Sequence, residues 1–323
     1  SLGKTFEGIT LRVSAVSGPY LDAIEEVMAS AFERDTGAKV QMIPTYGDEI
    51  IQIVAAPEDN PPFDCTYLFI PDVVRGMEEE LIQPFRLENV PNLADIPEFF
   101  SQDFDRGIDI NYAAPFDFGF AAIGYNKEAL SFTPTSYADF WRDEVQGKIA
   151  FNGNYWFGPA GTFAIVSDFA PGADELYTEE GWDAIIAKGN ELDVALWYDS
   201  GAAATAAMER GDVLMLLEAT EVVDPLVASQ PDKFGLIVPD EGAIGFMDYF
   251  GVVRGTPHRE ACETFINYML DPDLQAEWAE LVPYWMSNGT VNYGEKASAL
   301  LPDTYEDRVD FAIMLDWPHI VDN

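Results

Sequence analysis

The sequence of 323 residues predicts an α/β fold with mostly parallel sheets. Residues 10–16 alternate apolar and polar side chains, as a strand does, and residues 40–43 form a second strand that Pro44 is expected to close. Between them, apolar residues recur at helical spacing over residues 21–32, and Gly37 stands where a left-handed residue would end the helix. A strand, a helix and a strand of these lengths form a βαβ unit, so we expect its two strands to be parallel.

The alternation of helix and strand continues to the end of the chain. The predicted helices open at Ser136 and cover residues 179–190, 202–210, 260–270 and 274–281. The predicted strands cover residues 148–151, 193–198, 213–217 and 234–238. No internal repeat or low-complexity linker interrupts these segments. If the chain has two domains, we therefore expect strands rather than a flexible tether to join them.

The charge of the chain excludes several kinds of partner. There are 57 acidic and 17 basic residues, which gives a formal net charge of −40. Such a field repels nucleic acid and anionic membrane surfaces, because both are bound through clustered Lys and Arg. Disorder is also excluded, since 48% of the residues are hydrophobic and 13% are aromatic. The acidic residues are spread along the chain, which favours a solvated surface; alternatively, some of them line a site for a cationic ligand.

The two cysteines and the first residues give little information on their own. Cys65 and Cys262 belong to neither a CxxC nor a zinc spacing, so we expect buried free thiols. No apolar run approaches the length of about 20 residues that a transmembrane helix needs. The start lacks the features of a signal peptide, and Ser1-Leu2 resembles a cloning remnant, so we expect that any signal peptide has already been removed.

Most enzyme signatures are missing from the sequence. It contains no P-loop, no GxGxxG motif after a strand, no GxSxG elbow and no HExxH motif. His258 and His319 are expected at the surface or near a helix start rather than in a catalytic triad. A hydrolase with paired carboxylates remains an alternative, with Asp117, Glu218 and Asp248 as its candidate residues. We expect no cofactor and no metal ion.

Aromatic residues gather in segments at the predicted strand ends. These segments are residues 17–20, 116–118, 152–157, 197–198, 246–249 and 283–285. In open α/β sheets, ligands bind outside the carboxyl ends of the strands. Aromatic walls with a few carboxylates suit an organic cation, through cation–π attraction and charge-assisted hydrogen bonds. Each segment alone is typical of core packing, but their joint placement favours a binding site.

Many segments also match one known family in order along the chain. They are residues 31–40, 63–64 with 81–84, 114–119, 122–126, 135–141 with 147–148, 209–212, 239–242 and 265–272. By their order and spacing, the sequence resembles the extracytoplasmic solute-binding proteins of ABC transporters, in the branch of the spermidine/putrescine-binding proteins. The resemblance implies a two-lobed periplasmic-binding-protein fold of type II, with two crossing strands and lobes that close on a ligand.

The resemblance also implies where the lobes divide. It places the crossing strands near residues 115–119 and 245–252. One lobe would then contain residues 1–117 and 250–292. The other lobe would contain residues 118–249 and 293–323.

The ligand residues of the polyamine binders carry over only in part. Asp248 stands at the position of a carboxylate that binds an amine, and Tyr284 matches an aromatic residue of the pocket. Phe246 replaces a tryptophan. The acidic pair of the family falls on Asn154 and Phe157, a wall tryptophan on Leu217, and a serine and a tyrosine on Phe69 and Pro71. The resemblance therefore implies the fold and the class of protein, but not spermidine as the ligand.

Together these observations predict an exported, monomeric solute-binding component of an ABC importer, without catalytic activity. It would capture a small, polyamine-like amine in the periplasm or another extracytoplasmic space and deliver it to a membrane permease. The expected ligand residues are Asp248, Phe246, Tyr284, Trp156, Asn154, Trp197, Ser17, Tyr20, Phe69, Asp117 and Glu218.

Alternatives stay open for the ligand and for the roles of Asp248 and Glu218. A zwitterion or aminophosphonate would suit the backbone N–H groups at Ser17-Gly18. A ferric ion would require a tyrosine pair, and the sequence has no adjacent Tyr-Tyr. Asp248 alternatively pairs with Arg254 or caps a turn, and Glu218 alternatively caps a helix or lies in its first turn.

Overall fold

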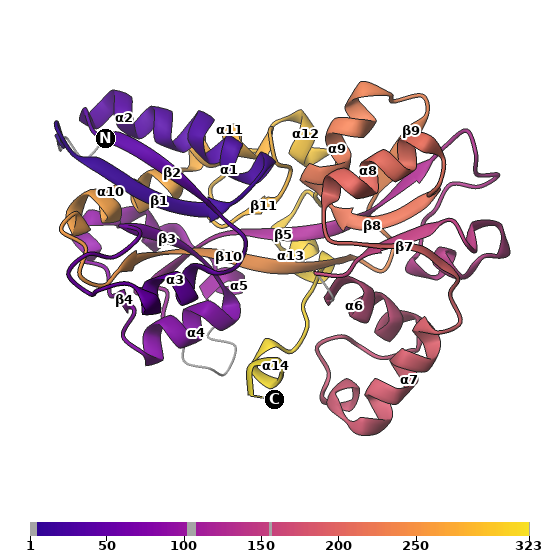
Figure 1. The fold of residues 1–323 in the computed structure, drawn as a ribbon. Helices are drawn as coiled ribbons and strands as arrows, with labels where there is room; N and C mark the ends of the chain where they lie inside the picture. Colours follow the sequence, from indigo (N-terminus) through magenta and orange to yellow (C-terminus); the bar gives the residue numbers. More distant parts are fainter. Residues whose placement is uncertain (1–4, 102–107, 155–156, 323) are drawn as a thin grey trace. The chain divides into compact units, whose positions relative to one another are not determined.

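The structure is a computed structural model that describes residues 5–101, 108–154 and 157–322. The chain forms two compact units. Unit 1 contains residues 1–118 and 247–299, and unit 2 contains residues 119–246 and 300–323. Two strands, β5 (Ala113–Asn126) and β10 (Ala243–Val253), contribute residues to both units (Figure 1). Each unit is therefore built from separate stretches of the chain.

Unit 1 contains the predicted βαβ unit. Strand β1 (Thr10–Val16) pairs in parallel with β2 (Lys39–Thr45) and with β3 (Cys65–Phe69), while β10 runs antiparallel to β3. The prediction that Pro44 closes the second strand is wrong, because Pro44 lies inside β2 and pairs in register with Ala15. Since β2 is the last strand in the order, a residue without an N–H group is tolerated there.

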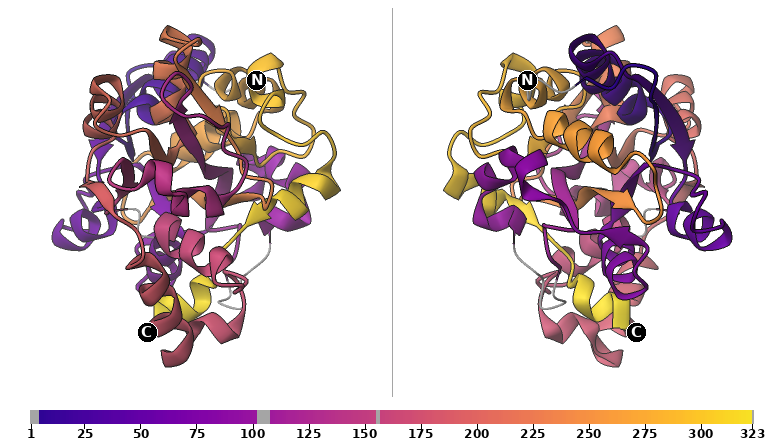
Figure 2. Two further views of the ribbon diagram at one scale, coloured as in Figure 1. Left: turned by 90° about the vertical axis from the view of Figure 1, so that its right-hand side faces the viewer. Right: turned by 90° about the vertical axis from the view of Figure 1, so that its left-hand side faces the viewer.

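A long helical segment packs beside two later helices in unit 1. It consists of α1 (Pro19–Ala23), the π-helical turn η1 (Ile24–Ala29) and α2 (Ser30–Thr36). It ends at Gly37 with φ = 76°, the left-handed conformation that the sequence predicts. Helices α10 (Arg259–Met269) and α11 (Pro272–Ala279) lie against η1 (Figures 1 and 2). These two helices come from the second stretch of unit 1.

The expectation of free thiols is wrong. Cys65, at the start of β3, forms a disulfide with Cys262 of α10, with 5.6 Å between the two Cα atoms. Both cysteines are buried as expected. The two positions are 197 residues apart, so no local spacing in the sequence could indicate the bond. Disulfides of this kind are typical of proteins in oxidising compartments outside the cytosol.

Shorter elements complete unit 1. They are α3 (Glu49–Ala55), α4 (Ile70–Glu78), β4 (Ile82–Gln83), α5 (Glu98–Ser101), β11 (Trp285–Met286) and α12 (Glu295–Ser298), with the 3₁₀ turns η2 (Leu87–Asn89) and η3 (Pro91–Asp95). β4 pairs with β10, and β11 pairs with β5.

Unit 2 has a mixed sheet. Strand β6 (Ile149–Asn152) pairs in parallel with β7 (Val194–Tyr198) and β8 (Met215–Ala219). β5 runs antiparallel to β8 and β9 (Phe234–Ile237), so the long strand departs from the predicted parallel pattern. These strands agree with the predicted ones within two residues at each end.

Helices α6 (Phe157–Val166), α8 (Gly201–Arg210) and α9 (Thr220–Ser229) pack against this sheet, and α7 (Glu179–Gly189) packs against α6. Ser136 opens the 3₁₀ helix η4 (Tyr137–Trp141) rather than an α-helix, and its hydroxyl accepts a hydrogen bond from the Ala138 N–H. The remaining elements are η5 (Asp143–Val145), η6 (Asp174–Tyr177), α13 (Tyr305–Phe311), β12 (Ala312–Ile313) and α14 (Trp317–Asp322).

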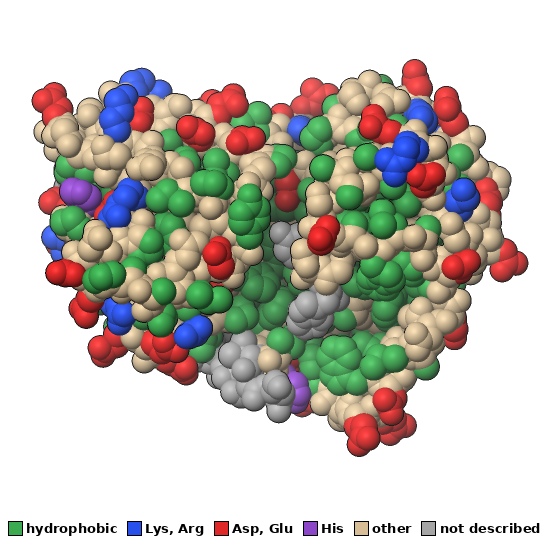
Figure 3. Space-filling view, in the orientation of Figure 1, with side chains coloured by type: hydrophobic (Ala, Val, Ile, Leu, Met, Phe, Trp, Pro, Cys, Tyr) green, Lys and Arg blue, Asp and Glu red, His purple; other side chains and the backbone are tan. Residues whose placement is uncertain are grey.

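Acidic side chains are scattered over the face in view rather than gathered in one patch (Figure 3). His258 directly precedes α10, and His319 lies in α14 with its ring 4.8 Å from that of Tyr177. In the parts of the chain that the structure describes, no helix combines the length and the hydrophobicity needed to span a membrane.

Candidate functional site

Unit 1 contains a buried group of carboxyl and hydroxyl side chains, which we call the acidic cluster. It consists of Tyr20, Tyr67, Asp117 and Asp248. The Tyr20 hydroxyl donates to Asp117 Oδ2 at 2.9 Å, and the Tyr67 hydroxyl donates to Asp248 Oδ1 at 2.5 Å. Asp117 is fully buried, and Asp248 is 2% exposed. Three of these residues were predicted from the sequence, and Tyr67 was not.

The fold brings the cluster together at one edge of the sheet. Tyr20 lies in α1, which follows β1, and Tyr67 is the middle residue of β3. Asp248 of β10 pairs in register with Phe69, the last residue of β3. Asp117 of β5 pairs with Met286. The cluster thus lies where the parallel strands end, which is where ligands bind in open α/β sheets.

The carboxyl group of Asp248 is in an unusual electrostatic environment. Burial raises its pKa to about 7, although hydrogen bonds with Tyr67, Asp117 and Tyr20 act to lower it. Burial also raises the pKa of Tyr20, as does the charge of Asp117, so the Tyr20 hydroxyl keeps its proton and remains a donor. Ionised Asp248 is therefore costly unless a cation comes close to it.

Two other buried acids of unit 1, Asp64 and Glu263, have arginine partners. Asp64 pairs with Arg12 at 3.0 Å, and Glu263 pairs with Arg86 at 2.7 Å and with Arg259 at 2.9 Å. Burial alone would raise the pKa of Glu263, but its hydrogen bonds, led by Arg86, bring the pKa below its usual value.

Asp248 differs from these two acids. Among the described residues, no Lys or Arg forms an ion pair with Asp248. This includes Arg254, the partner considered from the sequence, whose backbone N–H donates to the Leu81 carbonyl.

Aromatic rings pack around the cluster. The ring of Tyr20 lies edge-on to Trp278, with centroids 5.2 Å apart, and edge-on to Tyr67 at 6.0 Å. Phe116 packs against Trp278 at 5.0 Å. Tyr284, predicted as a pocket residue, is buried, and the centroid of its ring lies 6.1 Å from that of Trp278. It therefore packs among the aromatic side chains next to Tyr20.

Two more acids lie at the same edge of the sheet. Glu49 is the first residue of α3, which follows β2, and it is 1% exposed. Burial raises its pKa to about 7. Asp72 lies in the first turn of α4 and accepts a hydrogen bond from the Phe69 N–H at 3.4 Å; burial raises its pKa to about 6. Neither residue is among the ligand residues predicted from the sequence, although an acid opening a short apolar helix after a strand is a recognisable signal.

Unit 2 holds a separate buried carboxyl group, Glu218, at the end of β8. Glu218 Oε1 accepts from the Ala219 N–H at 2.8 Å, and Oε2 accepts from Asn152 Nδ2 at 3.0 Å. Burial raises the pKa of Glu218, against these two bonds and a hydrogen bond from Tyr198. Glu218 does not cap α9, because the residue at that position is Ala219.

Beside Glu218 is a pocket of about 20 Å³, which has space for one water molecule. Phe157 and Phe246, whose ring centroids are 5.5 Å apart, line this pocket.

The other predicted residues lie elsewhere. Asn154 is exposed and donates its backbone N–H to Asn152 Oδ1, while Trp197 is 52% exposed and packs on Phe151. The Ser17 N–H donates to the Thr45 carbonyl, so this backbone group is already used. Trp156 lies outside the described residues. Of the predicted set, the structure therefore brings together Asp117, Asp248, Tyr20, Phe69 and Tyr284 in unit 1.

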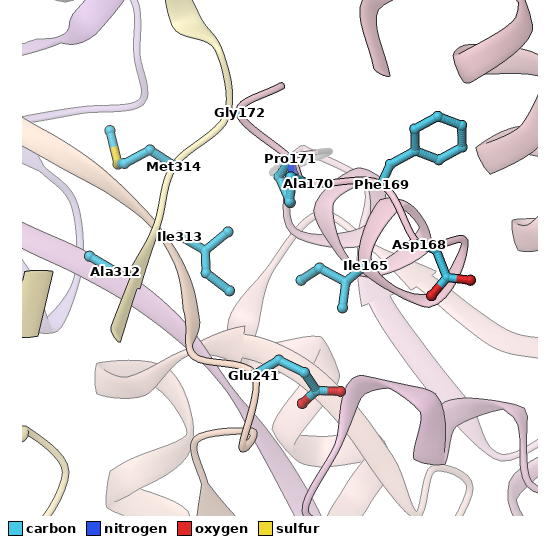
Figure 4. Close-up of a pocket in the computed structure, with 10 residues that line it drawn as sticks. All are labelled: Ile165, Asp168, Phe169, Ala170, Pro171, Gly172, Glu241, Ala312, Ile313 and Met314. Atoms are coloured by element: carbon cyan, nitrogen blue, oxygen red, sulfur yellow. The ribbon is translucent and has the colours of Figure 1, made fainter. Parts of the chain in front are cut away.

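A larger hollow of about 510 Å³ lies in unit 2 (Figure 4). Apolar side chains, including Ile165 and Ile313, form most of its wall, and Asp168 and Glu241 are its two acids. Neither acid is buried, and none of the predicted ligand residues lines this hollow.

Over the described residues, no group of three or more His, Cys, Asp or Glu side chains is arranged to hold a metal ion.

The raised pKa of Asp248 predicts a pH-dependent stability difference. A group whose pKa is raised on folding contributes stability below its unfolded pKa, near 4, and loses that contribution as the pH rises through about 7. Without a ligand, Asp248→Asn is therefore expected to be more stable than the wild type by about 2 to 4 kcal/mol at pH 8. This advantage should shrink towards pH 5. Urea unfolding of both proteins at the two pH values measures it, and a constant difference would contradict the assignment.

Comparisons with known proteins agree with this architecture. Residues 27–306 match the family model described as "Bacterial extracellular solute-binding protein". The gamma-aminobutyric acid-binding protein of Pseudomonas aeruginosa is 26% identical over 94% of this chain and 82% of its own length. The spermidine/putrescine-binding periplasmic protein of Escherichia coli is 22% identical over 78% of this chain and 71% of its own length.

Solved structures are similar across almost the whole chain. An ABC transporter substrate-binding protein from Bradyrhizobium japonicum has a TM-score of 0.79 at 19% identity, covering 97% of this chain and 95% of its own. The spermidine/putrescine-binding protein PotD from Streptococcus pneumoniae has a TM-score of 0.77 at 16% identity, covering 98% of this chain and 97% of its own. At these identities, the likeness establishes a shared fold.

Proposed function

Because the chain belongs to the bacterial extracellular solute-binding proteins, the solute-binding components of ABC importers, we propose that its solute is a small amine held by Asp248. The family consists of binding proteins rather than enzymes, so the paired carboxylates Asp117 and Asp248 are assigned to binding and not to hydrolysis. The polyamine-like ligand, the delivery to a permease by a monomer and the two lobes inferred from the sequence are parts of the same proposal.

One observation carries the amine assignment. Asp248 is a buried carboxyl group for which the described residues supply hydrogen-bond donors but no cation, whereas the buried acids Asp64 and Glu263 have arginine partners. A buried charge without a partner costs several kcal/mol, and a ligand cation would remove that cost. The aromatic rings behind Tyr20 provide the apolar surroundings in which such an ion pair is strongest.

The solutes in the names of the relatives share the chemical group that Asp248 is proposed to bind. Gamma-aminobutyric acid, spermidine and putrescine differ in length and charge, but each carries a primary ammonium group near neutral pH. The first of these relatives also favours a second candidate, a zwitterion with an amine and an acid group. Its ammonium group would bind Asp248 in the same way, and its acid group would bind outside the acidic cluster.

Isothermal titration calorimetry at pH 8 tests the amine assignment. The ligands are putrescine, spermidine, 4-aminobutyrate and 2-aminoethylphosphonate, with butyrate and phosphate as controls that lack the amine. We expect saturable binding of at least one amine and no binding of butyrate or phosphate. Binding of the anions without binding of any amine would contradict the proposal.

A further inference from the structure

One carboxyl oxygen of Glu49 has no hydrogen-bond partner among the residues that the structure describes. Glu49 Oε1 contacts the Thr45 hydroxyl, while Oε2 is buried without a hydrogen-bond partner in the structure. The residue is 1% exposed, so bulk water does not solvate this oxygen freely. A buried carboxyl oxygen without a partner is rare in proteins and calls for an explanation such as a functional role, a water molecule or an ion.

The hydrogen bonds around Thr45 indicate whether the Glu49 carboxyl group is protonated when no ligand is bound. The Thr45 hydroxyl lies within hydrogen-bond distance of two acceptors, the Ala15 carbonyl at 3.0 Å and Glu49 Oε1. One hydroxyl hydrogen cannot serve both acceptors well. If Glu49 is protonated, its own O–H donates to Thr45, and the Thr45 O–H donates to Ala15. The local geometry therefore favours a neutral Glu49 in the absence of a ligand.

Three other acids interact electrostatically with Glu49. Asp48 precedes it, Asp72 lies in α4, and Asp248 lies in β10; the charges of Asp48 and Asp72 act on Glu49, and Glu49 acts on Asp248. An anionic ligand group would be repelled at this position, whereas a cationic one would be attracted. The strand order β2-β1-β3-β10 places all these residues at the same edge of the unit 1 sheet.

We propose that Glu49 is a second ligand carboxylate, which releases its proton when a second cationic nitrogen of the solute binds to Oε2. This inference rests on the proposed function, because it assumes that Asp248 holds the first ammonium group. Glu49 releases its proton to the buffer, and the resulting carboxylate forms an ion pair with the cationic nitrogen of the solute. Solutes with two cationic nitrogens are thereby favoured over solutes with one.

The test compares 1,4-diaminobutane with butylamine, which has the same number of carbon atoms but one charge. Both are titrated calorimetrically at pH 6.5 in two buffers of different ionisation enthalpy, which gives the number of protons released. The proteins are the wild type, Glu49→Gln, Glu49→Asp and the control Glu241→Gln, an exposed acid of unit 2.

We expect the wild type to release more protons with the diamine than with butylamine. Glu49→Gln should remove this excess and weaken diamine binding about tenfold or more, while butylamine affinity stays within about threefold. Glu49→Asp should keep part of the excess proton release, because it keeps the carboxylate. Glu241→Gln should behave as the wild type does.

Two results would overturn the inference, and they are distinguishable. If the wild type releases the same number of protons with both amines, or if Glu49→Gln loses the same affinity for both amines, Glu49 is not part of the ligand site. Either result would leave the amine function intact. If neither amine binds the wild type, the proposed function fails, and the role of Glu49 fails with it. Melting temperatures of all four proteins establish that the variants are folded.

Discussion

Asp248→Asn is expected to weaken amine binding by about 2 to 5 kcal/mol, which is about 30-fold to 5,000-fold in Kd. The variant keeps the size of the side chain and an oxygen that accepts from Tyr67, but it removes the charge that faces the ligand cation. In a buried site this charge is poorly screened, so its loss has a large effect. Calorimetric titration with the tightest amine of the panel measures the change.

Asp240→Asn is the matched control, since it makes the same substitution at an exposed position of unit 2. It should leave the affinity within about twofold of the wild type. An unchanged affinity in Asp248→Asn would exclude this residue from the site. Because the same variant is expected to be more stable at pH 8 without a ligand, weaker binding cannot be attributed to unfolding.

Removal of the disulfide has the second large expected effect, on stability. The bond between Cys65 and Cys262 closes a loop of almost 200 residues, and such bonds stabilise a fold mainly by restricting the unfolded chain. The double variant Cys65→Ala/Cys262→Ala is expected to lose about 3 to 5 kcal/mol of the free energy of unfolding. Urea unfolding followed by tryptophan fluorescence measures the loss.

The wild type treated with a reductant provides the control for this variant. It should unfold at a similar urea concentration to the double variant, because both lack the bond while only one lacks the sulfur atoms. The double variant itself should not respond to the reductant. Equal midpoints for the oxidised wild type and the double variant would show that the bond contributes nothing to stability.

The sequence was most informative where local patterns determine local structure. Gly37 ends its helix in the left-handed conformation, as predicted, and Gly211 after α8 does the same, because glycine adopts this conformation without a steric penalty. The parallel pairing of β1 and β2 followed from the length of the segment between them. Pro44 was misplaced because the exposed edge of a sheet, which permits proline, is a property of the strand order and not of the local sequence.

The site was only partly predictable, for a related reason. Asp248, Asp117 and Tyr20 stood out through the resemblance and the aromatic segments, but Tyr67 lies in a stretch that looks like ordinary core. Its importance comes from a cross-strand neighbour, because Tyr67 reaches Asp248, which is 181 residues away in the sequence. Similarly, the pairing of Cys65 with Cys262 depends on a contact between β3 and α10 that no local spacing encodes.

The division of unit 1 into two stretches has a consequence for biosynthesis. During translation, residues 119–246 emerge before the second stretch, residues 247–299, exists. Unit 1 therefore cannot acquire β10, α10 or α11, or close its disulfide, until most of the chain has been made. Asp248 joins Tyr20 and Asp117 only at that late stage. Binding competence should thus appear after nearly complete synthesis, and shortened chains that end before residue 247 should expose the apolar surface that these elements cover.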